Sequence, residues 1–291
     1  MKWEGNRESD NVEDRRGSGG GGGMPVFGGR SIGIGTIVIA LVGGWVLGIN
    51  PLTILGLLSG GGMPAQVQQA PAQRPPADDT MARFVSTVLA DTEDVWQTVF
   101  REGGGRYQEP RLVLFRGATP TACGTGQAAM GPFYCPADQK VYIDLGFYET
   151  LKSRLGAPGD FAQAYVIAHE VGHHVQHLLG ITSKVDQMRG RVSQKEYNAM
   201  SVRLELQADC FAGVWAHHAQ NARQILEQGD VEEAMNAAAR IGDDALQRAS
   251  GGAVVPDSFT HGSSAQRQRW FHTGLKQGSV QACDTFSARS L

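Results

Sequence analysis

The sequence predicts an α+β domain that is mostly helical, contains a small antiparallel sheet and follows one transmembrane helix. Three features lead to this prediction: an uncharged apolar run near the N-terminus, short apolar runs in the middle of the chain, and long helical patterns after them. Strands followed by helices, without regular alternation, are typical of α+β domains. The 291 residues suffice for one sizeable domain with appendages, and the net charge of −3 predicts no nucleic-acid partner.

The first 58 residues predict a membrane anchor. Residues 1–30 combine opposed charges with a glycine run, which is typical of a disordered segment. Residues 31–58 carry no charge and include an apolar run close to the roughly 20 residues that cross a bilayer. Arg30 precedes this run and the next basic residue is Arg74, so we expect a cytoplasmic N-terminus and a C-terminal domain that is periplasmic or extracellular. The alternatives are a cleaved signal peptide, although no clear cleavage site follows, and a glycine-rich buried helix.

The rest of the chain divides into a linker and one folded domain. Residues 59–77 are rich in Gly, Pro, Gln and Ala and predict a flexible linker, so the domain should span residues 78–291. Its middle part has apolar runs at 112–115, 133–134 and 141–144, separated by turn residues. We expect 141–144 at the edge of the sheet, where an extended peptide could pair with it.

Helical spacing and capping patterns place four helices around these strands. The first spans residues 79–101 and ends at a glycine run. Each of the other three opens with a capping pair, in which the second residue follows three positions after the first. The pairs and the expected extents are Asp160 with Gln163 for 161–179, Ser193 with Glu196 for a helix to about 221, and Asp230 with Glu233 for a helix to about 248.

All four cysteines lie in the predicted domain. Four cysteines allow three pairings. We favour Cys123–Cys135, which would close a local β-loop, and Cys210–Cys283, which would tie the C-terminal tail to the core. Both bonds would persist in an oxidising compartment, and free buried thiols are the alternative.

His169, Glu170 and His173 form an H-E-x-x-H motif on the largely apolar helix 161–179. Residues four apart share a helix face, so both imidazoles can reach one zinc ion. Glu170 lies slightly aside, where it can hold a water molecule as a general base. The alternative is a chance match between two buried histidines and a glutamate.

The second predicted part of this site is Glu205 with Asp209. The two carboxylates are four residues apart and flanked by apolar side chains, and charges in such a setting need a partner or a metal. We predict Glu205 as the third zinc ligand and Asp209 as the acceptor of the second ring N–H of His169. Two carboxylates on a solvated helix face are the alternative.

These motifs resemble the gluzincin metallopeptidases, in which a downstream glutamate is the third zinc ligand. The whole chain is more closely similar to a bacterial membrane-anchored family described as putative neutral zinc metallopeptidases. The resemblance runs through Met1-Lys2-Trp3, Asp14–Gly17, Gly131–Pro136, Ile241–Asp244, Ser258–Gly262 and Cys283–Phe286. It implies a zincin-like fold, peptidase activity and one zinc ion per chain.

The predicted function is zinc-dependent hydrolysis of peptide bonds in a peptide or protein substrate. Glu170 would take a proton from water and return it to the leaving amine. His261, in a polar loop, is a candidate second donor to the oxyanion, and a structural loop histidine is the alternative. The competing functions are a non-catalytic zinc-holding envelope scaffold and a zinc hydrolase of another amide.

Overall fold

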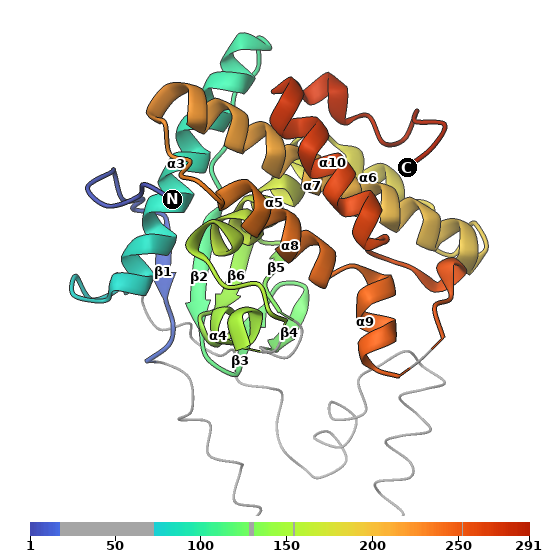
Figure 1. Ribbon diagram of the computed structural model, residues 1–291, viewed down its shortest axis with the longest axis horizontal. Helices are drawn as coiled ribbons and strands as arrows, with labels where there is room; N and C mark the ends of the chain where they lie inside the picture. Colours follow the sequence, from blue (N-terminus) through green and yellow to red (C-terminus); the bar gives the residue numbers. More distant parts are fainter. Residues whose placement is uncertain (18–72, 128–130, 154, 252) are drawn as a thin grey trace, which may run out of the picture. The chain divides into compact units, whose positions relative to one another are not determined.

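A four-stranded sheet and the helices beside it form the α+β fold of this protein (Figure 1). The computed structural model describes residues 1–17, 73–127, 131–153, 155–251 and 253–291. In spatial order the strands are β1 (Val12–Asp14), β2 (Arg111–Phe115), β6 (Lys140–Asp144) and β5 (Phe133–Cys135). A separate hairpin is formed by β3 (Ala118–Thr121) and β4 (Gly124–Gln127).

The sheet is mixed rather than antiparallel. β1, β2 and β6 run parallel to one another, and only β5 pairs antiparallel with β6. Along the chain, the β3–β4 hairpin and β5 come after β2 and before β6. The chain then enters the sheet again as β6, parallel to β2. The predicted edge position of 141–144 is also wrong, because β6 lies between β2 and β5 in the sheet.

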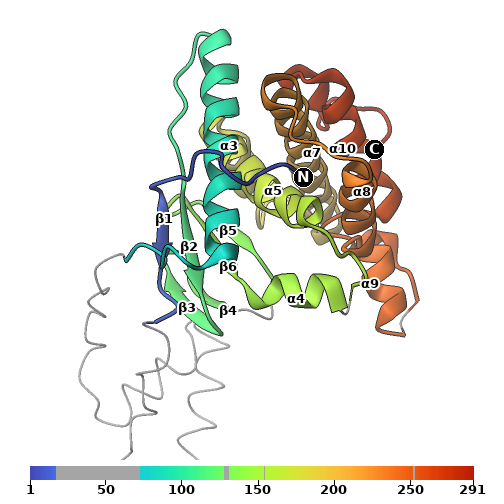
Figure 2. The same ribbon diagram turned by 60° about the vertical axis from the view of Figure 1, so that its left-hand side comes forward.

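Helix α5 (Asp160–Leu178) is the centre of the helical part. It contacts β5 and β6 on one side and the helices α3 (Thr80–Glu102), α7 (Gln194–Arg223) and α8 (Asp230–Arg240) on the others. Figure 2 shows α7, α8 and α10 (Ser264–Gln277) on the side of α5 away from the sheet. The shorter helices are α4 (Gly146–Ser153), α6 (Ile181–Asp186) and α9 (Asp243–Ala249), with 3-10 turns η2 (Pro256–Ser258) and η3 (Val280–Cys283).

The predicted helices form, but only one of the three predicted capping boxes does. Ser193 accepts from the backbone of Glu196 and its own backbone donates to the Glu196 side chain, as predicted. Asp160 and Asp230 lie inside the first turns of α5 and α8 and instead accept hydrogen bonds from the α-amino group of Met1, at 2.7 and 3.4 Å. The helix expected to reach about 248 is instead divided into α8, which ends at Arg240, and α9, which begins at Asp243. Between them Gly242 packs closely on Ser264, since a Cβ at position 242 would lie 2.5 Å from the backbone nitrogen of Ser264.

The N-terminal segment belongs to the folded body. Residues 1–17, predicted to be disordered, include β1, and Val12 is only 5% exposed against Leu112 of β2. Charge pairing compensates for the polar composition that suggested disorder, since Glu13, Asp14 and Arg16 all form ion pairs. Gln73, in the predicted linker, bridges to Asp14, so the ordered chain resumes before residue 78.

The predicted membrane topology is corrected by this packing. The expected anchor at 31–58 lies outside the described residues, as do 18–30 and 59–72. Across residues 1–17 and 73–291, apart from the gaps given above, no helix is long and apolar enough to cross a membrane. Since β1 and β2 share one sheet, the predicted arrangement of a cytoplasmic N-terminus with the catalytic domain on the other side is wrong.

Both predicted disulfides are present. Cys123–Cys135 joins the turn of the β3–β4 hairpin to the end of β5. Cys210–Cys283 joins α7 to η3, and both of its residues are fully buried. The second bond ties the C-terminal segment to the helix that carries Glu205 and Asp209.

Candidate metal centre

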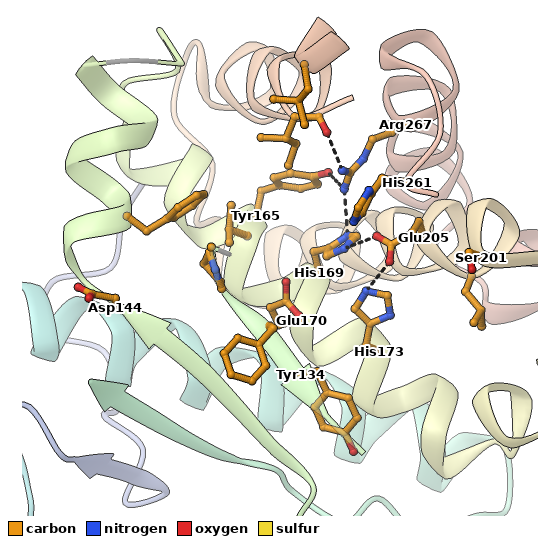
Figure 3. Close-up of a pocket in the computed structure, with 18 of the residues that line it drawn as sticks. Tyr134, Asp144, Tyr165, His169, Glu170, His173, Ser201, Glu205, His261 and Arg267 are labelled. Atoms are coloured by element: carbon orange, nitrogen blue, oxygen red, sulfur yellow. Dashed lines mark hydrogen bonds and ion pairs between the residues drawn. The ribbon is translucent and has the colours of Figure 1, made fainter. Parts of the chain in front are cut away.

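His169, Glu170 and His173 line one cleft because α5 is buried along most of its length. The apolar residues of α5 pack into the core on several sides, which places the three polar side chains at the cleft wall. The cleft has a volume of about 1010 Å³, and Figure 3 shows the three side chains together with Glu205, His261 and Arg267. The structure thus brings the residues of the H-E-x-x-H motif to one accessible surface.

Glu205 reaches this surface from α7. Its Oε2 lies 3.2 Å from Nε2 of His169, and its Oε1 lies 3.5 Å from Nε2 of His173. The two helices approach closely at Gly172, where a Cβ would lie 2.9 Å from the carbonyl oxygen of Ala208. A side chain at position 172 would push α7 away and separate Glu205 from the histidines.

This donor set fits a zinc ion. The ligand atoms of His169, His173 and Glu205 lie within 4.8 Å of one another. Zinc bonds of about 2.0–2.2 Å in tetrahedral geometry place ligand atoms about 3.4 Å apart, which matches the two separations above. Two imidazoles and one carboxylate also leave a fourth position open, as catalytic zinc sites do.

Asp209 is the buried acceptor beside His169. It is 0% exposed, and its Oδ1 lies 2.8 Å from Nδ1 of His169. Since the carboxylate can only accept, His169 donates from Nδ1 and keeps the lone pair of Nε2 for a metal. Tyr165 also donates to Asp209, and Arg267 of α10 donates to both carboxylate oxygens at 2.9 Å.

The charge of Asp209 is balanced by Arg267. Burial alone would raise the pKa of the Asp209 carboxyl, but the charge of Arg267 and the hydrogen bond from His169 lower it below its usual value. Arg267 is itself only 2% exposed, and its guanidinium also lines the cleft. The pair therefore keeps Asp209 ionised in a site that water hardly reaches.

Two carboxyls in the cleft are shifted in opposite directions. Burial raises the pKa of Glu170, which forms no hydrogen-bonded ion pair among the described residues. Burial also acts on Glu205, but the neighbouring His173 and His169 hold its pKa well below the usual range. Opposite shifts of this kind separate a proton-transferring carboxyl from one that stays ionised.

His261 lies in a loop that returns to the cleft wall. Its Nδ1 lies 3.2 Å from Oδ1 of Asp243, and Figure 3 shows the imidazole beside Arg267 and Glu205. The other oxygen of Asp243 accepts the backbone N–H groups of Thr260, His261 and Gly262 at 2.7, 2.7 and 3.1 Å. The hydrogen bond to Asp243 raises the pKa of His261, although burial opposes it.

Arg267, Tyr165, Asp243 and Gln176 are site residues that the sequence reasoning missed. Tyr165 precedes His169 by four residues on α5, so helical spacing alone could have indicated it. Ser263 and Gln266 form a capping box that opens α10, and this signal could have placed Arg267 on a helix. No local pattern indicates that Arg267 meets Asp209, 58 residues away.

Comparisons with known proteins agree with the motifs. A family model described as putative neutral zinc metallopeptidase matches residues 1–286. The chain is 53% identical to the uncharacterized protein YpfJ of Escherichia coli (strain K12), over 98% of this chain and 99% of the relative. It is 41% identical to the uncharacterized protein Rv2575 of Mycobacterium tuberculosis, over 72% and 73% of the two chains. No solved structure matches this chain.

Proposed function

The chain belongs to the family of putative neutral zinc metallopeptidases, and from this premise we propose that it is a zinc-dependent endopeptidase of zincin-like architecture. The observation that carries the proposal is the convergence of His169, His173 and Glu205 in a cleft that Glu170 also lines. Two neutral imidazoles and one carboxylate would hold one zinc ion per chain.

Glu170 is the general base of the proposed reaction. Zinc bound at this site would polarise the scissile carbonyl and lower the pKa of a bound water toward about 7. Glu170 takes a proton from the attacking water and delivers it to the leaving amine. Its raised pKa suits a group that has to accept and then release a proton near neutral pH.

His261 and Arg267 are donors that face the same cleft. Both are cationic or proton-donating groups at its wall, and both are oriented by a carboxylate, Asp243 and Asp209 respectively. Preorganised donors of this kind stabilise negative charge on a carbonyl oxygen as the tetrahedral centre forms. We assign this contact to His261, because the guanidinium of Arg267 already donates two hydrogen bonds to Asp209.

The substrate is an extended peptide with a large apolar side chain near the scissile bond. β5 borders the cleft and has no strand on its outer side among the described residues, so a peptide can pair with it as an added strand. Apolar side chains of Phe147, Leu155 and Val166 line the cleft. Val166 lies one helical turn before Glu170, which places this apolar wall next to the reacting bond.

The test compares the full chain with Glu170→Gln on an unfolded protein such as casein, with bound zinc measured in both. Zinc-dependent cleavage by the wild type alone would support the peptidase and the role of Glu170. The rival function is a zinc-holding scaffold, which needs the three ligands but not Glu170. A Glu170→Gln protein that binds zinc and cleaves casein at the wild-type rate would reject the assigned base.

A further inference from the structure

Gln176 is a buried amide between the two helices that carry the proposed zinc ligands. It is 0% exposed and follows His173 by three residues on α5. Its Oε1 lies 2.9 Å from Nδ1 of His173, and its Nε2 donates to the carbonyl oxygen of Leu204 at 2.7 Å. The same Nε2 donates to Oε1 of Gln207 at 3.1 Å. The amide therefore uses its oxygen and both of its N–H groups.

The orientation of this amide follows from its partners. The backbone carbonyl of Leu204 can only accept, so the NH₂ group of Gln176 has to face α7 and the oxygen has to face His173. An amide oxygen can only accept as well. His173 therefore carries its proton on Nδ1, and the lone pair of its Nε2 points toward Glu205, 3.5 Å away.

A second buried amide, that of Gln207, accepts the remaining N–H of Gln176. Nε2 of Gln207 donates to the carbonyl oxygen of Cys283 at 2.9 Å, which leaves Oε1 of Gln207 to accept from Gln176. Cys283 is bonded to Cys210 on α7, so this carbonyl is held in place covalently. The carbonyl of Leu204 thus fixes the direction of the Gln176 amide, and the carbonyl of Cys283 fixes that of the Gln207 amide.

We propose that Gln176 is a positioning residue for zinc, which presets the ring orientation and tautomer of His173 and holds α7 at the spacing that Glu205 requires. The spacing argument rests on Leu204, because this residue directly precedes Glu205 and its carbonyl receives the Gln176 amide. His169 has a charged acceptor, Asp209, in the equivalent place, whereas His173 has this neutral one. The inference rests on the proposed zinc site and adds a residue that acts through one of its ligands.

The experiment measures zinc affinity in the full chain by competition with a chromophoric chelator at one pH. Gln176→Met removes the acceptor of His173 at nearly constant volume, and we expect zinc affinity to fall about 10- to 100-fold. Gln207→Met is the matched control, because it removes a neighbouring buried amide and leaves the contacts of Gln176 with His173 and Leu204 intact. We expect its zinc affinity to stay within about threefold of wild type.

A conservative variant and the melting temperature of the metal-free protein separate positioning from packing. Gln176→Glu keeps an oxygen opposite His173, and its protonated form can still donate to Leu204, so it should recover zinc affinity to within about tenfold of wild type. This variant also tests the proposal should Gln176→Met not fold. The metal-free Tm should fall similarly in Gln176→Met and Gln207→Met, while only the former loses zinc.

Two results would overturn the inference while leaving the zinc site in place: wild-type zinc affinity in Gln176→Met, or equal losses of affinity in Gln176→Met and Gln207→Met. A folded Gln176→Glu protein with no recovery would count against it as well. Absence of zinc binding by the wild type would instead overturn the proposed function, and this role with it.

Discussion

At the scale of single residues, the site depends on the buried carboxylate of Asp209 and the partners that balance its charge. Asp209 lies among Tyr165, His169 and Arg267 with no exposed surface. A buried carboxylate with a bidentate arginine partner costs little only while both partners are present. The same carboxylate orients His169, so its removal should affect both the stability of the fold and the binding of the metal.

Asp209→Asn should weaken zinc binding and the fold together. The amide no longer neutralises Arg267, which we expect to lower the free energy of unfolding by about 3–5 kcal/mol. It also orients His169 less well, so zinc affinity should fall about 10- to 100-fold. The control is Asp91→Asn, because Asp91 is also buried and pairs with Arg223 and Trp215 away from the cleft. Chelator competition measures the zinc affinity and urea unfolding measures the stability. Equal losses of zinc affinity in the two variants would contradict the account.

His261→Gln should lower kcat with little change in KM. A donor to the developing oxyanion contributes a factor of about 10²–10³ to kcat. It interacts little with the substrate before the reaction, so KM should change little. Steady-state kinetics on one peptide would measure the change. His272→Gln is the control, because His272 is exposed on α10 and does not line the cleft. A kcat within twofold of wild type would remove His261 from the mechanism.

The residues of the candidate site that the sequence could indicate are those related by helical spacing. His169, Glu170 and His173 share one turn of helix, and Glu205 and Asp209 share another, so the spacing alone puts each set on one face. Arg267 and Asp243 enter from segments far along the chain. Their positions depend on how α10 and α9 pack, and no local pattern encodes that packing.

At the scale of helices and strands, local sequence signals predicted the positions of the elements along the chain. They predicted less well which groups the polar residues at the helix ends contact. The helices near 79–101, 161–179 and 194–221 and the strands near 112–115, 133–134 and 141–144 form as predicted. Asp160 and Asp230 have the spacing of capping residues, but the ammonium group of Met1 competes for their oxygens. A charged donor forms a stronger hydrogen bond than a backbone N–H, so the tertiary contact replaces the local one. Whether neighbouring strands run parallel or antiparallel also depends on tertiary pairing, and the local pattern of apolar and polar residues does not indicate it.

Glu13 should make the sheet sensitive to acid. On β1, it forms ion pairs with Arg15, with Arg111 of β2 at 3.1 Å and with Lys140 of β6 at 3.0 Å. Burial alone would raise its pKa, but hydrogen bonds from Lys140, Arg15 and Arg111 lower it from 4.5 to about 2. The pKa is lower in the folded state, so the stabilisation is present above about pH 4.5 and is lost as the pH falls toward 2.

Glu13→Gln should therefore lower the free energy of unfolding at pH 7 by about 3 kcal/mol and lose less stability than the wild type between pH 4.5 and 2. Urea unfolding at several pH values measures both effects. Glu8→Gln is the control, because the ion pair of Glu8 with Arg83 is exposed and should contribute only a few tenths of a kcal/mol. Parallel pH profiles for wild type and Glu13→Gln would contradict the assignment.

At the scale of the whole molecule, the N-terminal residues form part of the same sheet and the same apolar core as the rest of the described chain. Composition predicted a disordered N-terminal segment, yet β1 pairs with β2, and Met1 is 8% exposed within the main apolar core. A sequence rich in charge and glycine looks disordered when its charges are counted without their partners. Several of those partners, on β2, on β6 and at the N-cap of α3, are separated from it by at least 60 residues of chain.

A fragment of residues 78–291 should be less stable than the full chain. It lacks β1, so the edge of β2 and the ion partners of Glu13 become exposed. Each kcal/mol lost lowers Tm by about 2–4 °C for a domain of this size, and we expect a fall of about 10 °C. Val12→Asp in the full chain should act in the same direction, because it puts a charge at a position that is 5% exposed. Equal Tm values for fragment and full chain would show that β1 contributes nothing to stability.

The most direct test of the central claim is a zinc titration of the metal-free full chain, followed by cleavage of a fluorogenic peptide with leucine or phenylalanine beside the scissile bond. We predict that activity rises linearly and stops at one zinc per chain, and that Glu170→Gln binds the same single zinc but stays at least about 10³-fold less active. Stoichiometric zinc binding without cleavage of this peptide or casein, or undiminished cleavage by Glu170→Gln, would contradict a peptidase with Glu170 as its base.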